Sequence, residues 1–250
     1  MPDLGAIPVE HRPLPVPDRP WAGRMSWRDL LFAHWPIPAS ALRPHVPAAL
    51  EIEEFRGTAW LAVIPFEMTD MRLRGAPAIP GLARTLELNV RTYVRRGSVP
   101  GVWFFSLDAE SRLAVMGARR LYHLNYLHAR MDIERTNDGV SLYTCRRVHR
   151  GAPPAKFSAG YRPTGAPRPS EPGSLEHWLT ERYVLFSTDR RGRLYRGDIH
   201  HAPWLLQPAK ADIAINTMTE QLGVTLPAAR PILHFAKPLD VLVWTLEPMA

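Results

Sequence analysis

The residues best suited to chemistry lie in one stretch of this sequence, from Leu86 to Arg95. Side chains of a β-strand point alternately to its two faces, and the residues of this stretch alternate accordingly. One face is largely apolar, whereas the other carries an acid, an amide, guanidinium groups and a phenol. The two faces are Leu86, Leu88, Val90, Thr92 and Val94 on one side, and Glu87, Asn89, Arg91, Tyr93 and Arg95 on the other. The polar face is typical of a solvated surface and equally of the wall of a ligand-lined barrel or cleft, and the pattern leaves both interpretations open.

If it lines a cavity, this polar face predicts a site for a small molecule that carries a negative charge or a carbonyl group. Glu87 and Arg91 are about 13 Å apart along the strand, which is too far for direct contact but suits residues that hold opposite ends of a ligand. Tyr122 and Tyr126, on a later predicted strand, offer phenol donors. The structural alternative is that Glu87 and Arg91 each pair with a charge on a neighbouring strand.

The sequence lacks the common signatures of catalytic and metal sites. It contains no GxSxG, no Walker loop, no HExxH and no CxxC. Cys145, the only cysteine, lies in mid-strand and is predicted to be a buried structural thiol. No histidine spacing requires a metal site, so we expect neither a metal nor a cofactor. The three lysines lie near prolines and lack a neighbouring lysine, which favours solvated positions over a Schiff-base role for Lys210 or Lys237.

Size and charge narrow the classes of function. The 250 residues suffice for one domain with a sizeable core, and the net charge of +7 comes almost entirely from arginine. Arginine suits small anionic partners, although a genome-wide preference for arginine would produce the same excess. We do not expect nucleic-acid binding, because the densest basic clusters, at residues 146–150 and 190–193, lack base-reading amides and stacking aromatics. No apolar run approaches the ~20 residues of a membrane helix, and no signal peptide is evident. We therefore expect a cytoplasmic protein that does not bind a membrane. The sequence leaves open whether the protein forms a homo-oligomer.

The pattern along the chain predicts about nine strands and three short helices in one β-rich α+β domain. Short turns indicate mostly antiparallel strands, and a closed or nearly closed sheet would leave few exposed edges. Residues 58–68 are apolar enough to be buried on both sides, and Ser174 is placed to cap a short helix. Residues 1–23 hold six prolines and are expected to form an extended or partly disordered arm, which leaves 24–250 as the domain.

Two further local signals concern a turn and a helix. Asn137 to Gly139, with the sequence NDG, is typical of a hairpin turn. Asp108 is predicted to cap a helix over Ala109–Arg120, with Leu113 and Met116 facing inward.

Six runs, in order along the chain, resemble the YqjF-like family of bacterial proteins, which is grouped with the acetoacetate decarboxylase-like superfamily. They are HWPIPASALRPHVP (34–47), TAWLAVIPFEM (58–68), ELNVRTYV (87–94), GVWFFSLDAESRLAVMGARRLYHLNY (101–126), LTERYVLFS (179–187) and IHHAPWLLQPA (199–209). The resemblance covers about residues 24–248. It implies a curved antiparallel sheet that forms a conical barrel around an internal cavity, and it gives the polar face of residues 86–95 a cavity to line.

The same resemblance bears on the chemistry. In acetoacetate decarboxylases, adjacent lysines after a Gly-containing segment supply a Schiff base, whereas the similar segment here, Gly117 to Tyr122, holds Arg119 and Arg120. Because the guanidinium of arginine stays protonated, it cannot form the imine, and decarboxylation by that mechanism is disfavoured. The resemblance also implies that Glu87 matches the acidic cavity residue of the decarboxylases.

Three hypotheses of function follow. The first is a protein that binds a small anionic or carbonyl-bearing molecule, with catalysis an open question. Its predicted site residues are Glu87 as the acid or base, and Arg91, Asn89, Arg119, Tyr122 and Tyr126 as ligand contacts. The second is a lyase that acts on a small keto acid through Lys210 or Lys237. The third is a non-catalytic interaction module whose proline-rich arm docks on a partner.

Overall fold

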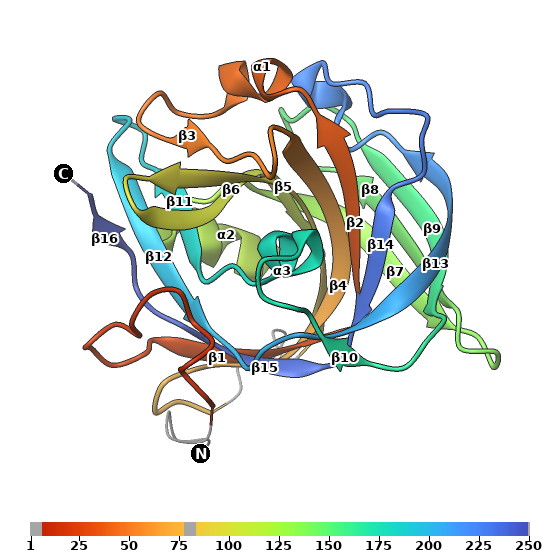
Figure 1. Cartoon of the computed structure of the whole chain (residues 1–250), viewed down its shortest axis with the longest axis horizontal. Helices are drawn as coiled ribbons and strands as arrows, with labels where there is room; N and C mark the ends of the chain where they lie inside the picture. The colour runs from red at the N-terminus through yellow and green to blue at the C-terminus, as the bar shows by residue number, and fades with distance from the viewer. Residues whose placement is uncertain (1–6, 78–83, 250) are drawn as a thin grey trace.

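One continuous sheet organises the structure, a computed structural model that describes residues 7–77 and 84–249 (Figure 1). Its strands are β1 Gly23–Arg28, β2 Leu30–Ile37, β3 Glu51–Ile52, β4 Ala59–Leu73, β5 Arg84–Arg96, β6 Val99–Ala109, β7 Tyr126–Arg135, β8 Ser141–Arg147, β9 Lys156–Pro163, β10 Arg168–Pro169, β11 Val184–Thr188, β12 Leu194–His200, β13 Leu205–Asn216, β14 Ile232–Ala236, β15 Leu239–Val243 and β16 Glu247–Pro248. The helices are short: α1 Ala39–Leu42, α2 Arg112–Leu121 and α3 Leu175–Thr180, with 3-10 turns η2 Arg43–His45 and η3 Glu220–Leu222. The predicted β-rich class is confirmed, with 16 strands in the described residues where about nine were expected.

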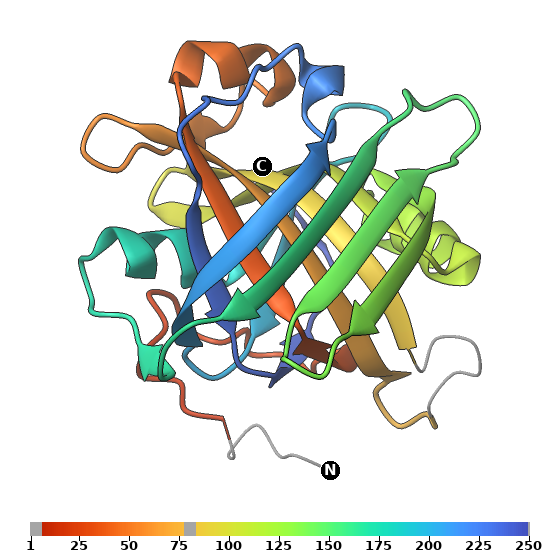
Figure 2. The ribbon, with the colours of Figure 1, turned by 90° about the vertical axis from the view of Figure 1, so that its right-hand side faces the viewer.

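The sheet closes on itself twice, because β4, β5 and β6 belong to two rings. The first ring runs β4–β5–β6–β7–β8–β9–β13–β14–β2 and returns to β4. The second ring runs β4–β5–β6–β11–β12–β15–β1 and also returns to β4. Figure 2 shows the outer strands of the first ring, β13, β9, β8 and β7, side by side. The shared strands therefore have one ring on each of their faces.

Apolar clusters fill the two sides of the shared strands. Leu88 and Val90 of β5 pack in the large core inside the first ring, together with residues of β7, β8 and β9. Ala62, Ile64 and Phe66, on the opposite face of β4, belong to a separate apolar cluster. Since successive residues of a strand alternate between faces, this second cluster lies on the side of the second ring.

The polar face of β5 points to the same side as that second cluster. The register pairs Glu87, Asn89 and Arg91 with Phe66, Ile64 and Ala62, and cross-strand partners lie on the same face of a sheet. Glu87 is 3% exposed and Asn89 is 6% exposed, while Arg91 is half-buried. The interpretation as a solvated surface is therefore wrong for these three residues, because the second ring and the elements packed on it cover their side chains, whereas Arg95 at the end of the same face is exposed.

Several local predictions are confirmed. Residues 59–68 of β4 are buried throughout. The turn at Asn137–Gly139 joins β7 to β8, and Gly139 has a φ of 79°, a left-handed conformation that glycine adopts without the steric cost of a Cβ. Ser174 caps α3, where its hydroxyl accepts a hydrogen bond from the backbone N–H of His177.

The helix predicted after β6 differs in its start and in its cap. β6 continues through Asp108, so this residue lies within the strand and is not an N-cap. α2 begins at residue 112, and the hydroxyl of Ser111 accepts from the backbone N–H of Ala114. The prediction placed the cap too early because a buried aspartate at the end of a strand has the same local sequence signature as a capping aspartate.

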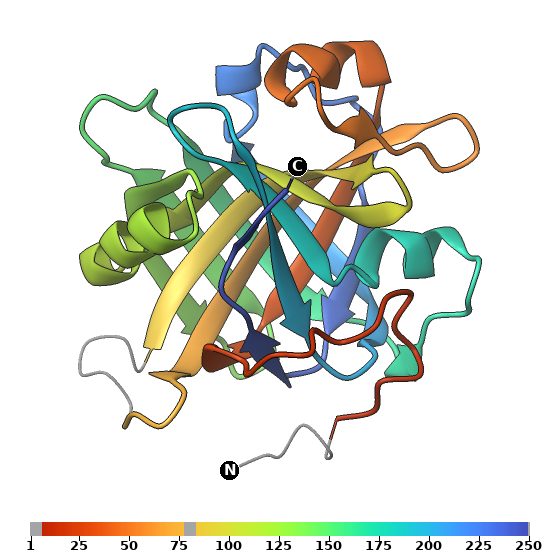
Figure 3. The ribbon, with the colours of Figure 1, turned by 90° about the vertical axis from the view of Figure 1, so that its left-hand side faces the viewer.

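The inward face of α2 was also predicted wrongly. Leu113 and Met116 are 54% and 59% exposed, and Val115 is the buried residue of this helix. Figure 3 shows α2 on the outside of the sheet, so only a narrow stripe of the helix contacts the barrel. The strand predicted over 121–133 correspondingly begins later, at Tyr126.

Asp108 instead forms an ion pair with Arg147 in the interior. The Nε and Nη2 atoms of Arg147 each donate to a carboxylate oxygen of Asp108 at 2.7 Å, and both side chains are at most 1% exposed. Arg147 also donates to Ser106 and to Gln221. Arg147 is thus a structural residue and not part of a basic surface.

The proline-rich arm lies against the domain from Ile7 onward and crosses β12 and β15 (Figure 3). Arg12 is 9% exposed, its Nη1 donates to the carbonyl of Ile199 at 2.5 Å, and its guanidinium lies 4.7 Å from the centre of the Tyr183 ring. Arg19 donates to the Glu247 carboxylate of β16. The described part of the arm contains a turn at Val9–Arg12 and is held against the domain by these contacts.

Candidate functional site

Glu87 and Tyr126 form one part of the candidate site. Glu87 lies in β5 and Tyr126 opens β7, and the Tyr126 hydroxyl donates to Oε2 of Glu87 at 2.8 Å. Burial raises the pKa of Glu87 to about 8, with a further contribution from the charge of Asp108, although the Tyr126 hydrogen bond opposes this rise. Burial and the adjacent Glu87 raise the pKa of Tyr126 well above 10, so Tyr126 remains a donor. A carboxyl group with a pKa near 8 is mostly protonated at neutral pH and can exchange a proton with a bound molecule.

Arg91 forms the second part of the site, further along the same face of β5. Its Nη2 donates to the carbonyl of Leu179 in α3 at 3.4 Å, and its guanidinium lies 5.6 Å from the centres of the Phe32 and Tyr93 rings. Within the described ranges no carboxylate pairs with Arg91 and no cationic side chain pairs with Glu87, so the alternative of charge pairing across strands is not observed for these two residues. A guanidinium that is half-buried among aromatic rings without a counter-ion is suited to binding an anion.

Polar atoms near Arg91 are buried without a hydrogen-bond partner. They include Oδ1 of Asn89, Nε of Arg91, and Nδ1 of His34 and of His234. Burial, reinforced by the charges of Arg91 and His234, holds the pKa of His34 well below 6.5, so its ring is neutral. Buried polar groups are normally hydrogen-bonded. These unpartnered atoms therefore mark a place where water or a ligand would complete the hydrogen bonding.

A second arginine in this region has its own counter-ion. The guanidinium of Arg182 lies 4.4 Å from the centre of the Trp178 ring and 5.1 Å from that of Tyr93, and its Nη1 binds Glu53 at 2.5 Å. Arg182 is thus neutralised, whereas Arg91 is not. In Figure 1, α3, which carries Trp178, lies within the outline of the second ring.

The sequence did not point to His34, His234 or Arg182 as neighbours of Arg91. These residues come from β2, from β14 and from the loop after α3, and only the closure of the sheet brings them together. The available signal was the alternation of β2, which places His34 on the same face as Phe32 once that segment is assigned as a strand.

Arg119 and Tyr122 lie apart from Arg91. Arg119, on α2, is exposed and donates to the backbone carbonyl of Tyr126 at 2.7 Å. Tyr122 is the half-buried C-cap of the same helix, and burial raises its pKa above 10. Arg119 lines a pocket whose walls include none of the polar residues of β5. The structure thus brings Glu87 together with Tyr126, keeps Asn89 beside Arg91 on the same strand, and places Arg119 in a separate pocket.

The remaining sequence candidates have the following environments. Lys210 and Lys237 are exposed, and Cys145 is buried in β8 at 3% exposure. Within residues 7–77 and 84–249, no three His, Cys, Asp or Glu side chains are grouped as metal ligands. In the same part of the chain, no helix is both long and apolar enough to cross a membrane.

Comparison with known proteins gives matches at the level of sequence and of structure. Residues 24–240 match DUF2071, a family described as "Uncharacterized conserved protein". The chain is 48% identical over 238 residues to the uncharacterized protein YqjF of Bacillus subtilis (strain 168), covering 95% of this chain and 97% of that protein.

Solved structures with the same fold have low sequence identity to this chain. The enduracididine biosynthesis enzyme MppR complexed with pyruvate matches with a TM-score of 0.63 and 11% identity over 96% of this chain and 93% of that one. An acetoacetate decarboxylase-like enzyme from Sphingomonas wittichii RW1 matches with a TM-score of 0.63 and 13% identity, covering 93% and 94%. Acetoacetate decarboxylase from Legionella pneumophila matches with a TM-score of 0.61 and 14% identity, covering 96% and 93%. These matches confirm the predicted acetoacetate decarboxylase-like fold.

Proposed function

This chain belongs to the DUF2071 family of uncharacterized conserved proteins, and from its fold and the polar face of β5 we propose that it binds a small keto acid. Arg91 holds the carboxylate of the ligand, and the carbonyl end of the ligand points along β5 toward Glu87. The observation that carries the proposal is the half-buried Arg91 guanidinium, which has no carboxylate partner in the described part of the chain.

The proposal follows from the cost of burying a charge. Moving a guanidinium away from water is unfavourable unless an opposite charge and hydrogen bonds replace the lost hydration. Arg91 donates a long hydrogen bond to the Leu179 carbonyl and interacts with the neutral Tyr93 hydroxyl, but its Nε has no partner. A ligand carboxylate would supply both the charge and a bidentate pair of acceptors, and such pairs are among the strongest hydrogen bonds in proteins. The unpartnered Oδ1 of Asn89 offers an adjacent acceptor for a ligand hydroxyl or a bound water.

Glu87 is the group best suited to any proton transfer that follows binding. Its pKa of about 8 leaves it largely protonated near neutral pH, so it can donate to a carbonyl oxygen and take the proton back. Tyr126 holds one of its carboxyl oxygens in place. The enzyme MppR has been solved complexed with pyruvate, which supports a small keto acid as the ligand class on this shared fold.

The alternative functions find less support. A Schiff-base lysine must be a free amine, which requires desolvation or a nearby cation, yet Lys210 and Lys237 are exposed to solvent. An arm that docks on a partner would have to leave its present contacts, because Arg12 is buried against β12 of its own chain.

Calorimetric titration tests the proposal with three related compounds: pyruvate, propionate without the keto group, and acetone without the carboxylate. We expect pyruvate to bind, propionate to bind more weakly, and acetone not to bind. Arg91→Gln should weaken pyruvate binding at least about tenfold, the loss expected for one charge-assisted pair. Arg95→Gln is the matched control, because Arg95 lies on the same strand but is exposed and paired with Glu51. Pyruvate binding that is equal in wild type and Arg91→Gln would refute the proposed role of Arg91.

A further inference from the structure

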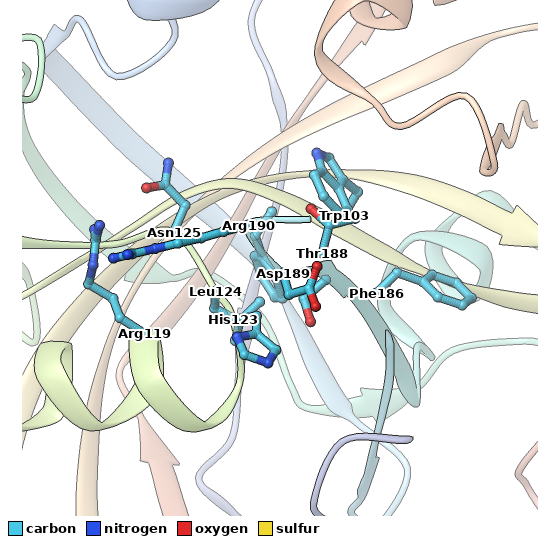
Figure 4. Close-up of a pocket in the computed structure, with 11 residues that line it drawn as sticks. Trp103, Arg119, His123, Leu124, Asn125, Phe186, Thr188, Asp189 and Arg190 are labelled. Atoms are coloured by element: carbon cyan, nitrogen blue, oxygen red, sulfur yellow. The ribbon is translucent and has the colours of Figure 1, made fainter. Parts of the chain in front are cut away.

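A pocket opens where the two parallel neighbours of β6 diverge. β11 pairs with the start of β6, at Val102 and Trp103, whereas β7 pairs with its end, from Leu107 onward. Between these two pairings the edge of β6 has no adjacent strand, and a pocket of about 300 Å³ lies there (Figure 4). Its residues come from β6, from the end of β11 and its turn, and from α2 and the loop that follows it.

The charges in this pocket are predominantly positive. Arg119 and Arg190 both line it, and in Figure 4 their side chains reach toward the side of the pocket where Asn125 lies. Neither arginine has a carboxylate partner in the described ranges; Arg119 donates only to the Tyr126 carbonyl. The acid in the pocket wall, Asp189, is already neutralised by Arg193, whose Nε donates to it at 2.7 Å.

Asp189 also has little capacity left for a further cation or donor. Its carboxylate accepts hydrogen bonds from the backbone N–H groups of Arg191 and Arg193 and from the hydroxyl of Tyr195, in addition to the Arg193 side chain. A ligand in the pocket therefore meets two guanidinium groups without a competing free carboxylate.

A buried hydroxyl in the wall has no partner. Ser187 of β11 is 1% exposed, lines the pocket, and its Oγ makes no hydrogen bond. Since a buried hydroxyl without a partner is unfavourable, this atom is available to donate to an acceptor placed in the pocket. Trp103 and Phe104, both half-buried, also line the pocket, and as consecutive residues of β6 they present their rings on opposite faces of the strand.

We propose that this pocket binds the oxyanion group, phosphate or carboxylate, of a small aromatic molecule. Arg119 and Arg190 hold the oxyanion, Ser187 donates to it, and the ring of the ligand lies against Phe104, which the parallel register of β6 and β11 places on the same face as Ser187. The pocket residues do not include Glu87, Asn89 or Arg91, so this site is distinct from the proposed keto-acid site, although Arg119 donates to the backbone carbonyl of Tyr126.

Titration with phenyl phosphate, benzoate and inorganic phosphate, followed by tryptophan fluorescence and by calorimetry, tests the proposal. The sequence supplies matched controls, because Arg120 and Arg191 are exposed neighbours of the two arginines but do not line the pocket. Arg119→Gln and Arg190→Gln should each weaken binding of an aromatic anion about tenfold, whereas Arg120→Gln and Arg191→Gln should leave it unchanged. Ser187→Ala should weaken binding a few-fold, and comparison of phenyl phosphate with benzoate identifies the preferred head group.

Three results would contradict the proposal that this pocket binds an aromatic oxyanion. One is the absence of binding for both aromatic anions at millimolar concentration. Another is equal weakening by the lining and the control substitutions, which would indicate diffuse attraction to a basic surface. The third is tight binding of inorganic phosphate alone with no gain from the phenyl group, which would remove the aromatic part of the ligand. Circular dichroism of each variant separates a loss of binding from a loss of fold.

Discussion

Glu87 provides the sharpest test of the buried polar face, because its protonation is linked to folding. Glu87→Gln keeps the size and shape of the side chain and leaves an oxygen that can accept from the Tyr126 hydroxyl. The pKa of Glu87 is about 8 in the folded protein against 4.5 for an ordinary glutamate. The unfolded chain therefore releases this proton at a lower pH than the folded chain. Stability of the wild type should fall as pH rises from 4.5 to 8 and level off above 8.

The size of this effect follows from the pKa difference. Each unit of pKa difference corresponds to about 1.4 kcal/mol of stability, so the wild type loses about 4 kcal/mol from this residue between pH 5 and pH 9. Glutamine does not titrate, and the Glu87→Gln protein lacks this loss. The two proteins should have similar free energies of unfolding near pH 5, and the variant should be more stable by about 4 kcal/mol at pH 9.

Urea unfolding of both proteins at intervals between pH 5 and pH 9 measures the difference. Taking the difference between the two proteins cancels the titration of every other group. Glu51→Gln, at an exposed glutamate paired with Arg95, serves as a control that should show no comparable trend. A difference between wild type and Glu87→Gln that stays constant within about 0.5 kcal/mol over this range would refute the argument, since it would mean that Glu87 ionises as it does in water.

Three further predictions concern stability and chemistry. Arg147→Met should destabilise the protein by about 3–5 kcal/mol in urea unfolding, because it leaves Asp108 charged and buried, and adding Asp108→Asn should recover part of this loss; a cost below about 1 kcal/mol would contradict the buried pair. Gly101→Ala should cost about 1–3 kcal/mol, because a Cβ there would lie 2.7 Å from the Phe186 ring and 2.8 Å from a backbone carbonyl of β11; an unchanged melting temperature would contradict this close approach. Borohydride treatment with pyruvate or acetoacetate should leave the mass of the protein unchanged, whereas a reduced adduct on any lysine would restore the Schiff-base mechanism.

The alternation of polar and apolar residues was sufficient to predict β5 as a strand with two different faces. The alternation over residues 86–95 correctly separates Leu88 and Val90, which pack inside the first ring, from Glu87, Asn89 and Arg91 on the opposite face. The alternation could not show whether the polar face is exposed to water or buried as the wall of a cavity. The answer depends on the second ring, which closes through pairings between β1, β4 and β15 that are distant in sequence.

Three placements depend on tertiary contacts that no local sequence pattern reports. Arg147 and Asp108 are charged residues whose burial is possible only because they meet each other across the first ring, and no local pattern reports such a partner. His34 becomes a neighbour of Arg91 only when β2 joins β14 and β4 in the closed sheet. Arg119 was grouped with the residues of β5 by resemblance, but α2 lies outside the sheet and places it in a different pocket.

A crystal structure of the protein with pyruvate would show whether the polar face of β5 binds the ligand. We expect the carboxylate oxygens of pyruvate at about 3 Å from the guanidinium nitrogens of Arg91, with the keto group directed along β5 toward Glu87. Pyruvate bound elsewhere, or a well-occupied pyruvate that leaves the Nε of Arg91 without a partner, would contradict the assignment of this face of β5 as the binding site.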